Sequence, residues 1–347
     1  MTALIDTGDP ALGTDLPNRR GFVASLAVIS ALVAAPALAQ TLPQNAPTTG
    51  TRLPPAEDEA AVLANLFTRM STKTTINGRT GFNWVLDTGA GRSAIAEDLI
   101  APLDLPSGLE IMVHGVTSAQ IAPTVKISRL AFGGRRFNDV HAAVFSRELL
   151  GADGLLGLDV LSGFELSFDM VQRTMMLTPS GPETVEFGRA FGPSSRIPRG
   201  ENSRIRTGRF GQLILLNAHA DGVSVECFVD SGAQSSIGNM ALYRALGGHE
   251  GPTIQRTLTP VYGVTGQTLM AERGGVGNLE INRQRLGPTS LLFADLHAFG
   301  ALDMIARPAL LIGGDILYRF RAVSLDFGRS RMAFRGLRRP LTAETRL

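Results

Sequence analysis

Short runs of apolar residues, separated by Gly, Pro, Asn and Asp, recur along most of the chain, and this pattern is typical of β-strands joined by turns. Two turn signals, Asn77-Gly78 and Asp221-Gly222, each lie between two apolar, β-prone stretches. Each signal predicts a β-hairpin whose second strand ends at an Asp, which is Asp87 in one case and Asp230 in the other.

Helical periodicity is much rarer. It is limited to residues 57–70, to short turns after Asp87 and Asp230, and to segments that follow Asp159 and Asn239. We therefore expect an all-β protein built from two similar, mostly antiparallel β-barrel lobes.

The second half of the chain repeats motifs of the first half in the same order. Val-Leu-Asp-Thr-Gly-Ala at 85–90 recurs as Phe-Val-Asp-Ser-Gly-Ala at 228–233, and a Ser follows six residues after each Asp. Leu-Leu-Gly at 155–157 recurs as Leu-Ile-Gly at 311–313. Ordered repeats of this kind indicate a duplicated structural unit.

The repeat divides the chain into segments. These are a twin-arginine signal peptide at 1–39, a leader with a short helix at 40–71, a first lobe at 72–180, a linker rich in Gly, Pro, Ser and Arg at 181–207, and a second lobe at 208–347. Asp87 and Asp230 then occupy equivalent places in two lobes related by a pseudo-two-fold axis.

The first 39 residues have the pattern of an export signal. Arg19, Arg20 and Phe22 resemble the start of a twin-arginine signal, and an Ala/Leu/Val run leads to the small-x-small triplet at 37–39. The apolar run of about 15 residues is shorter than the roughly 20 that a spanning helix needs, which favours cleavage over retention as an anchor. We therefore expect a periplasmic or secreted protein without membrane association after cleavage.

Composition narrows the possible partners and cofactors. A net charge of +2 is too small for a nucleic-acid-binding surface. Cys227 is the single cysteine, which excludes an intrachain disulfide and a Cys-based zinc site. The five histidines lack His-Glu-x-x-His spacing, and the chain has no P-loop and no Gly-x-Ser-x-Gly elbow. We expect no metal, no cofactor and no nucleic acid.

The two Asp residues at strand ends suggest a catalytic pair. An isolated charge is costly to bury there, whereas two carboxyls brought about 3 Å apart hold one proton between them. The ionised member can deprotonate a water, and the protonated member can donate to a scissile carbonyl. The sequence therefore predicts hydrolysis by a water activated between Asp87 and Asp230.

Neighbouring residues support this pair. Gly89 and Gly232 permit a tight turn and a close approach of backbone N–H groups to the carboxylates. Thr88 and Ser231 carry hydroxyls that can hydrogen-bond across the axis and lock the two loops together.

A substrate-covering flap is expected between each Asp loop and the closing strands. Two matching tripeptides lie there, namely Gly115, Val116 and Thr117, and Gly263, Val264 and Thr265. Plain hairpin turns have the same composition and are the alternative. Tyr262 joins this substrate-binding group, packed either beside the dyad or in the core.

A second repeated pair of acidic residues has a structural explanation. Asp159 and Asp315 each follow the Gly of the apolar-apolar-Gly element. At such positions we expect them to cap the helices that follow.

Together these motifs resemble those of retropepsin-like and pepsin-like aspartic proteases, over about residues 72–337. The shared elements are the Asp-[Thr/Ser]-Gly-Ala turns after two apolar residues, and the apolar-apolar-Gly element, which in the family threads the loop behind the catalytic turn. The resemblance implies a bilobal aspartic-protease fold in one chain, similar to bacterial periplasmic members. It also implies a monomer that acts on a peptide or protein substrate.

Two function classes remain open at this stage. The first is an exported aspartic endopeptidase, and the second is a catalytically silent peptide-binding or scaffold protein that keeps the fold. Both Asp residues are intact, which favours the first. With an upper dyad pKa of roughly 4.7, as in pepsin, the pH–rate profile is bell-shaped with an acidic optimum, and a raised pKa widens it towards neutrality.

Overall fold

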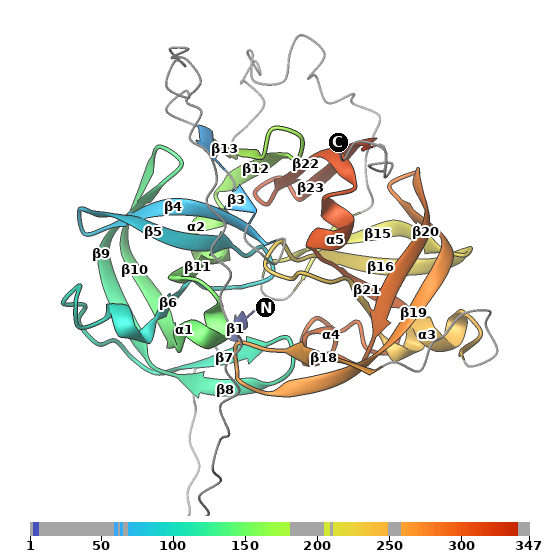
Figure 1. Ribbon diagram of the computed structural model, residues 1–347, viewed down its shortest axis with the longest axis horizontal. Helices are drawn as coiled ribbons and strands as arrows, with labels where there is room; N and C mark the ends of the chain where they lie inside the picture. The colour runs from blue at the N-terminus through green and yellow to red at the C-terminus, as the bar shows by residue number, and fades with distance from the viewer. Residues whose placement is uncertain are drawn as a thin grey trace, which may run out of the picture. The chain divides into compact units, whose positions relative to one another are not determined.

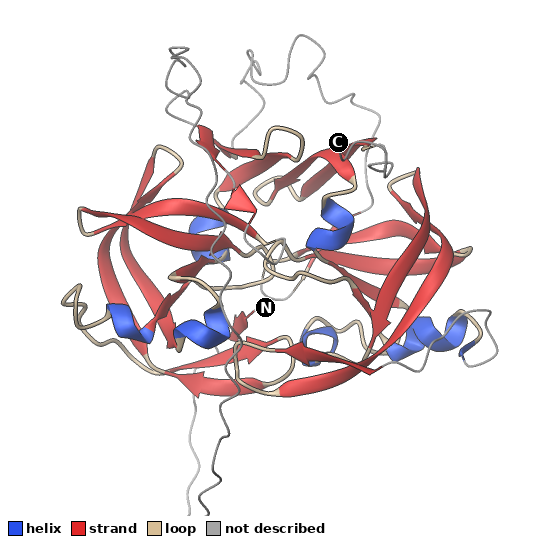
Figure 2. Cartoon of the chain, viewed as in Figure 1, coloured by secondary structure: helices blue, strands red, loops and turns tan. Residues whose placement is uncertain are grey.

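β-Strands dominate the computed structural model, and its helices are short (Figure 1, Figure 2). The structure describes residues 3–6, 59–61, 63–64, 69–180, 205–208, 211–248 and 258–338. All of these residues belong to one compact unit of the chain. The prediction of an all-β fold is confirmed.

The first lobe is a closed barrel. Its strands follow the order β4-β5-β11-β6-β10-β9, and a further β4–β9 pairing closes the ring. The strands are β4 (Met70–Ile76), β5 (Arg79–Leu86), β6 (Ala94–Ala96), β9 (Thr124–Phe132), β10 (Arg135–Phe145) and β11 (Gly154–Leu156). The predicted hairpin turn joins β4 to β5, and Asn77 and Gly78 both have the positive φ, 48° and 88°, that such a turn requires.

The second lobe repeats this barrel. Its order is β15-β16-β21-β17-β20-β19, closed by a β15–β19 pairing. The strands are β15 (Leu213–Ala220), β16 (Val223–Val229), β17 (Ile237–Gly238), β19 (Thr268–Ile281), β20 (Gln284–Phe293) and β21 (Ala309–Ile312). The same closing pattern in both lobes confirms the predicted bilobal β-barrel architecture.

A five-stranded sheet connects the two barrels. Its order is β2-β13-β12-β22-β23, formed by β2 (Glu59–Ala61), β13 (Thr174–Pro179), β12 (Phe164–Asp169), β22 (Phe320–Asp326) and β23 (Arg331–Leu337). Strands β12 and β22 are repeat equivalents and pair antiparallel, with Ser167 opposite Ser324. Equivalent residues face each other only at a two-fold axis, so the pseudo-symmetry axis passes through this pair.

Two hairpins and several short helices complete the lobes. The hairpins are β7 (Ile111–Gly115) with β8 (Ala119–Ala122), and β18 (Leu258–Tyr262) with the start of β19. The helices are η1 (Glu97–Leu99), α1 (Arg147–Leu150), α2 (Leu158–Leu161), α3 (Met240–Ala245), α4 (His297–Ala301) and α5 (Gly314–Leu317). None of the helices in the described ranges has the length and apolarity needed to cross a bilayer.

The helix predicted over 57–70 is wrong for the part of this segment that the structure describes, which is 59–61, 63–64 and 69–70; the rest of the segment lies outside the described residues. This segment instead contributes β2, the short strand β3 (Leu63–Ala64) and the first residue of β4. Its short apolar pattern fits a helix and a strand equally well, and the edges of β13 and β4 supply backbone partners for β2 and β3. Tertiary pairing therefore overrides the local pattern.

The lobe boundary also moves. The last residues assigned to the linker form β14 (Ile205–Thr207), which pairs with β15. The rest of that linker, 181–204, lies outside the described residues, as do residues 7–39 of the predicted signal peptide. Residues 3–6 form β1 (Ala3–Asp6), which pairs antiparallel with β7.

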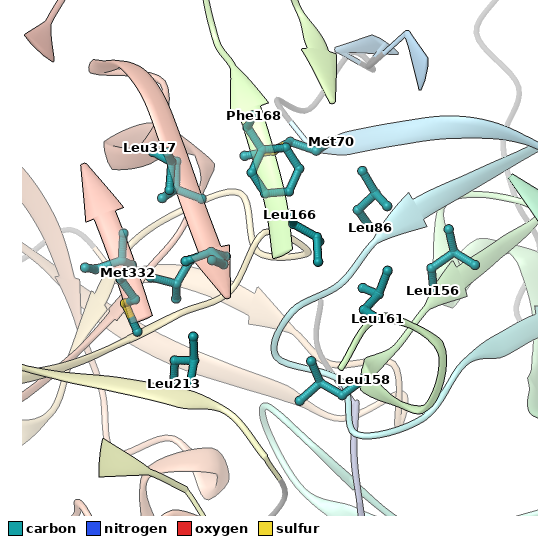
Figure 3. Close-up of a cluster of buried hydrophobic side chains, with 14 of the residues drawn as sticks. Met70, Leu86, Leu156, Leu158, Leu161, Leu166, Phe168, Leu213, Leu317 and Met332 are labelled. Carbon is teal, nitrogen blue, oxygen red and sulfur yellow. The ribbon is translucent and has the colours of Figure 1, made fainter. Parts of the chain in front are cut away.

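The two lobes share a hydrophobic core. Figure 3 shows Leu86 and Leu156 of the first barrel in one buried cluster with Leu213 of the second barrel and with Leu166 and Met332 of the connecting sheet. Because apolar burial is the main favourable contribution to folding, this common core fixes the ends of β5 and β16 relative to each other. The Asp loops begin at those strand ends.

Candidate active site

Each Asp begins a loop at the end of a buried strand. Asp87 follows β5 and Asp230 follows β16, and both side chains are fully buried. The Asp87 N–H donates to the carbonyl of Leu156 at 2.9 Å, and the Asp230 N–H donates to Ile312 at 2.9 Å. The apolar-apolar-Gly elements thus hold both Asp residues from behind.

The Gly of each element is required by close packing. A Cβ on Gly157 would lie 2.4 Å from the backbone carbon of Arg92, and one on Gly313 would lie 2.8 Å from that of Ser235. Since backbone atoms cannot yield easily, these contacts explain why both repeats carry Gly there.

Both loops turn their backbone N–H groups onto the carboxylate. Oδ1 of Asp87 accepts from the N–H groups of Gly89 at 3.1 Å and Ala90 at 2.9 Å. Oδ1 of Asp230 accepts from Gly232 at 2.9 Å and from the residue after it at 3.0 Å. These bonds fix each carboxyl group in the same orientation relative to its loop.

The two carboxyl-bearing loops touch. A Cβ on Gly232 would lie 2.5 Å from both Cγ and Oδ2 of Asp87, so the absence of a side chain there lets the second loop reach the first carboxyl. The carboxylate of Asp230 is close enough for its negative charge to raise the pKa of Asp87.

Hydroxyl groups lock the loops together across the pseudo-axis. Thr88 Oγ1 donates to the carbonyl of Val229 at 2.9 Å and accepts from the Ser231 N–H at 3.1 Å. Ser231 Oγ donates to the carbonyl of Leu86 at 2.7 Å and accepts from the Thr88 N–H at 3.2 Å. Each hydroxyl therefore satisfies one buried donor and one buried acceptor of the other lobe.

We expect Thr88→Val to destabilise the protein by about 2–4 kcal/mol, because it leaves the Val229 carbonyl and the Ser231 N–H buried without a partner. Denaturant unfolding would measure this loss. Thr88→Ser is the matched control, since it keeps the hydroxyl and should cost about 1 kcal/mol or less. Equal stability of the two variants would contradict the assigned role of the hydroxyl.

Burial changes the proton affinity of the pair. It raises the pKa of Asp87 to about 8, and the negative charge of Asp230 adds to this rise. Burial also raises the pKa of Asp230, against the hydrogen bonds from Gly232 and Ala233. The pair therefore retains a proton at neutral pH. An upper dyad pKa of roughly 4.7, as assumed from the sequence, would leave both carboxyls ionised at that pH.

Asp159 and Asp315 are not the N-cap residues of their helices, although Asp315 Oδ1 accepts from the Ile316 N–H in the first turn of α5 at 2.8 Å, so the capping prediction holds only in part. Both α2 and α5 have a Gly at the N-cap without a side-chain hydrogen bond. Asp159 Oδ1 instead accepts from the N–H and hydroxyl of Ser93, both at 2.8 Å. Asp315 accepts in the same way from Ser236. In the sequence, a Ser lies six residues after each of Asp87 and Asp230. This repeated spacing is the sequence feature that accompanies the Ser–Asp hydrogen bonds.

The flap tripeptides meet at the tips of the two hairpins. Thr117 Oγ1 lies 3.4 Å from Thr265 Oγ1, and the Ser118 hydroxyl lies 2.7 Å from the same atom. Gly115 and Gly263 are needed for this approach, since a Cβ would lie 2.9 Å from Thr265 Cγ2 in the first case and 2.0 Å from Thr117 Oγ1 in the second.

Each flap tip packs into the opposite lobe. Val116 of the first flap joins a buried cluster whose other members, such as Phe228 and Phe299, come from the second lobe. Val264 of the second flap joins a cluster of first-lobe residues that includes Val85 and Leu155. This exchange joins each hairpin tip to the hydrophobic core of the opposite lobe. Tyr262 takes no part, because its side chain is 56% exposed, so neither packing position expected for it is found.

Two residues near the dyad have no counterpart in the motifs. Arg69 precedes β4 and is 4% exposed, and Gln212 precedes β15 and is fully buried. Gln212 Nε2 donates to the carbonyl of Gly89 at 3.0 Å. Counting back from the hairpin turns would place residues 68 and 213 opposite the Asp residues, whereas a register shift within each ladder, which the sequence does not reveal, brings Arg69 and Gln212 there instead.

Within the described ranges, His, Cys, Asp and Glu side chains form no group of three or more that is arranged to hold a metal ion. Cys227 is buried, and burial raises the pKa of its thiol, which is unfavourable for a nucleophilic or ligating thiolate.

Comparison with known proteins relates this site to other sequences. A family model described as aspartyl protease matches residues 72–160, which include Asp87, Thr88 and Gly89. Among solved structures, a retropepsin-like aspartic protease from Rickettsia conorii is 18% identical, with 34% of this chain and 89% of that chain covered and a TM-score of 0.27. A TM-score this low carries no argument about the fold, so the architecture described above is based on the strand pairings of this chain. A search of curated proteins returned no match.

Proposed function

We propose that this chain is an aspartic endopeptidase that cleaves peptide bonds with a water activated between Asp87 and Asp230, and the match of residues 72–160 to the aspartyl protease family model supports this. One observation carries this proposal: two equivalent Asp loops, one from each lobe, converge in a buried site where the carboxyl pair retains a proton. A shared proton is what general acid–base hydrolysis by two carboxyls needs.

The reaction would use the two protonation states together. The ionised carboxylate removes a proton from water as its oxygen attacks the peptide carbonyl carbon, and the protonated carboxyl donates to the carbonyl oxygen. The resulting tetrahedral species collapses when the nitrogen takes a proton and the C–N bond breaks. Asp87 Oδ2 is buried and has no hydrogen-bond partner among the described residues, so it is available to a reacting group.

An extended peptide is the substrate form that the flaps would bind. Strand β7 accepts β1 as an antiparallel neighbour, with Ala3 opposite Gly115, which indicates that the edge of β7 opposite β8 can bind an extended backbone. The tip contacts between Thr117 and Thr265 would have to open for entry.

Hydrolysis of an unfolded protein, followed from pH 4 to pH 8 with and without a statine-type transition-state mimic, tests the proposal. We expect inhibited cleavage and a specific activity that is independent of enzyme concentration, because one chain supplies both carboxyls. Since burial raises the pKa of Asp87 to about 8, activity should persist to near-neutral pH. Peptide binding without cleavage would instead identify the catalytically silent form.

Export remains part of the proposal. Arg19, Arg20 and the triplet at 37–39 support twin-arginine export to the periplasm with cleavage before Gln40. We expect Arg19→Lys with Arg20→Lys to leave an uncleaved precursor in the cytoplasm, detected by fractionation and by the N-terminal sequence of the product. Normal export of the double variant would refute this localisation.

A further inference from the structure

A buried guanidinium lies beside the dyad, and the mechanism above does not use it. Arg69 Nη1 donates to the carbonyl of Leu150 at the end of α1, at 2.6 Å. The same nitrogen lies 3.2 Å from the position of a Cβ on Gly151. With 4% of Arg69 exposed, the guanidinium is held in the protein interior.

The strand register directs Arg69 towards the dyad. In the β4–β5 ladder Ser71 pairs with Val85 and Thr72 with Trp84, and this register, continued two residues past the last pair of the ladder, brings Arg69 opposite Asp87. Residues directly opposite each other in an antiparallel ladder project to the same face. The guanidinium and the Asp87 carboxyl are therefore on one side of the hairpin.

The second lobe has a neutral residue in the equivalent place. Ile214 pairs with Phe228, so Gln212 lies opposite Asp230. Its side-chain amide donates to the carbonyl of Gly89 and carries no charge. The fused chain thus places one cation, from the first lobe, beside a pseudo-symmetric pair of carboxyls.

We propose that Arg69 is a positioning residue whose charge keeps one carboxyl of the Asp87–Asp230 pair ionised and so sets the pH range in which the pair holds a single proton. Two buried carboxyls both favour the neutral form, which would leave no base to activate water. A nearby cation opposes this, because it favours the ionised carboxylate and so lowers the pKa of the carboxyl. The catalytic consequence rests on the proposed function, whereas the charge interaction does not.

The proton affinities agree with this placement. Burial is the largest cause of the raised pKa values of Asp87 and Asp230, and the Arg69 guanidinium acts against burial at both. The two carboxyls in turn favour the charged form of Arg69, against the burial that lowers its pKa.

Other charged side chains on the elements packed around the dyad are engaged elsewhere. Asp159 on α2 and Asp315 on α5 accept hydrogen bonds from serines. Arg147 on α1 forms ion pairs with Asp98 and Asp153. Two cations lower the pKa of both dyad carboxyls, the N-terminal ammonium and, with a smaller effect, the Arg69 guanidinium. The ammonium of Met1 is absent from a chain cleaved before Gln40, so Arg69 is the cation to be tested.

The pH–rate profile of Arg69→Gln tests the proposal. Without the cation both carboxyls hold their protons more tightly, so both midpoints of the profile should rise by about one unit or more. Arg69→Lys keeps the charge and should keep the wild-type midpoints. Gln212→Leu removes a buried hydrogen bond without a change in charge, so its rate should fall at unchanged midpoints. A slower Arg69→Gln enzyme with wild-type midpoints would show a purely structural role and overturn the proposal.

Proton linkage to unfolding supplies a readout that does not need activity. A carboxyl whose folded pKa is raised loses stability as pH increases from its unfolded pKa to its folded pKa. Because removal of Arg69 raises the folded pKa of each carboxyl further, the stability deficit of Arg69→Gln relative to wild type should grow as pH rises from the wild-type folded pKa of a carboxyl to its value in the variant, and for Asp87 this window begins near pH 8. In the Asp87→Asn, Asp230→Asn background the deficit should be independent of pH.

The outcomes separate the two proposals. A deficit that grows with pH in a protein that cleaves no peptide would support the role of Arg69 and refute the endopeptidase. If the protein cleaves peptides but the stability deficit of Arg69→Gln does not vary with pH, the endopeptidase is supported and the role of Arg69 is refuted. Arg69→Met, with an unbranched apolar side chain, is the second neutral variant and gives the same readouts if Arg69→Gln does not fold.

Discussion

Replacement of Asp87 or Asp230 by Asn should lower the rate of peptide hydrolysis by at least about 10³-fold, because each variant removes either the base or the acid from a pair that acts as a unit. Asn preserves the size of the side chain and can still accept from the loop N–H groups at Gly89 and Gly232. We therefore expect a folded, inactive protein. Initial rates with an unfolded protein substrate would measure the loss, and near wild-type cleavage by either variant would refute the assignment.

The same variant has a predicted effect on stability whose sign follows from the pKa. The folded pKa of Asp87, about 8, lies above its unfolded value, so its favourable contribution is complete below about pH 4 and is lost as pH rises through 8. Asn does not titrate. Asp87→Asn should thus gain stability relative to wild type as pH increases, by on the order of a few kcal/mol at pH 8. Unfolding curves at pH 4 and pH 8 check this, and a gain at pH 4 alone would contradict it.

Substitution of Gly232 by Ala should abolish activity as well, for a steric reason. The new Cβ would lie 2.5 Å from Cγ and Oδ2 of Asp87, whose short side chain is fixed by two hydrogen bonds and cannot move aside easily. Displacement of a reacting group by about 1 Å can cost roughly 10²-fold in rate. We expect at least that loss, together with about 1–3 kcal/mol of stability from overpacking.

Gly163→Ala is the matched control. A Cβ at Gly163 meets no atom within 4 Å, and its φ is not positive, so it should leave rate and stability nearly unchanged. A Gly232→Ala enzyme as active as this control would show that the second loop does not approach the Asp87 carboxyl as described.

Local physics explains why much of the fold could be read from the sequence. The Asn77-Gly78 turn, with its positive φ at both residues, specifies the β4–β5 hairpin and the strand end at Asp87 without reference to the rest of the chain. The duplicated motifs then place Asp230 in the same setting. By contrast, the segment 57–70 has no such local signal, and its strands form only because β13 and β4 offer free edges.

What the sequence determined by itself was the duplicated all-β architecture and two equivalent Asp turns at strand ends, because turn residues and apolar spacing act over a few residues. Only the tertiary structure decided that Val116 and Val264 pack into opposite lobes, that Asp159 binds Ser93, and that Arg69 faces the dyad. Those contacts join residues far apart in the chain. They depend on barrel closure and a shared core, where burial rather than local propensity selects the partner and sets the proton affinity of the site.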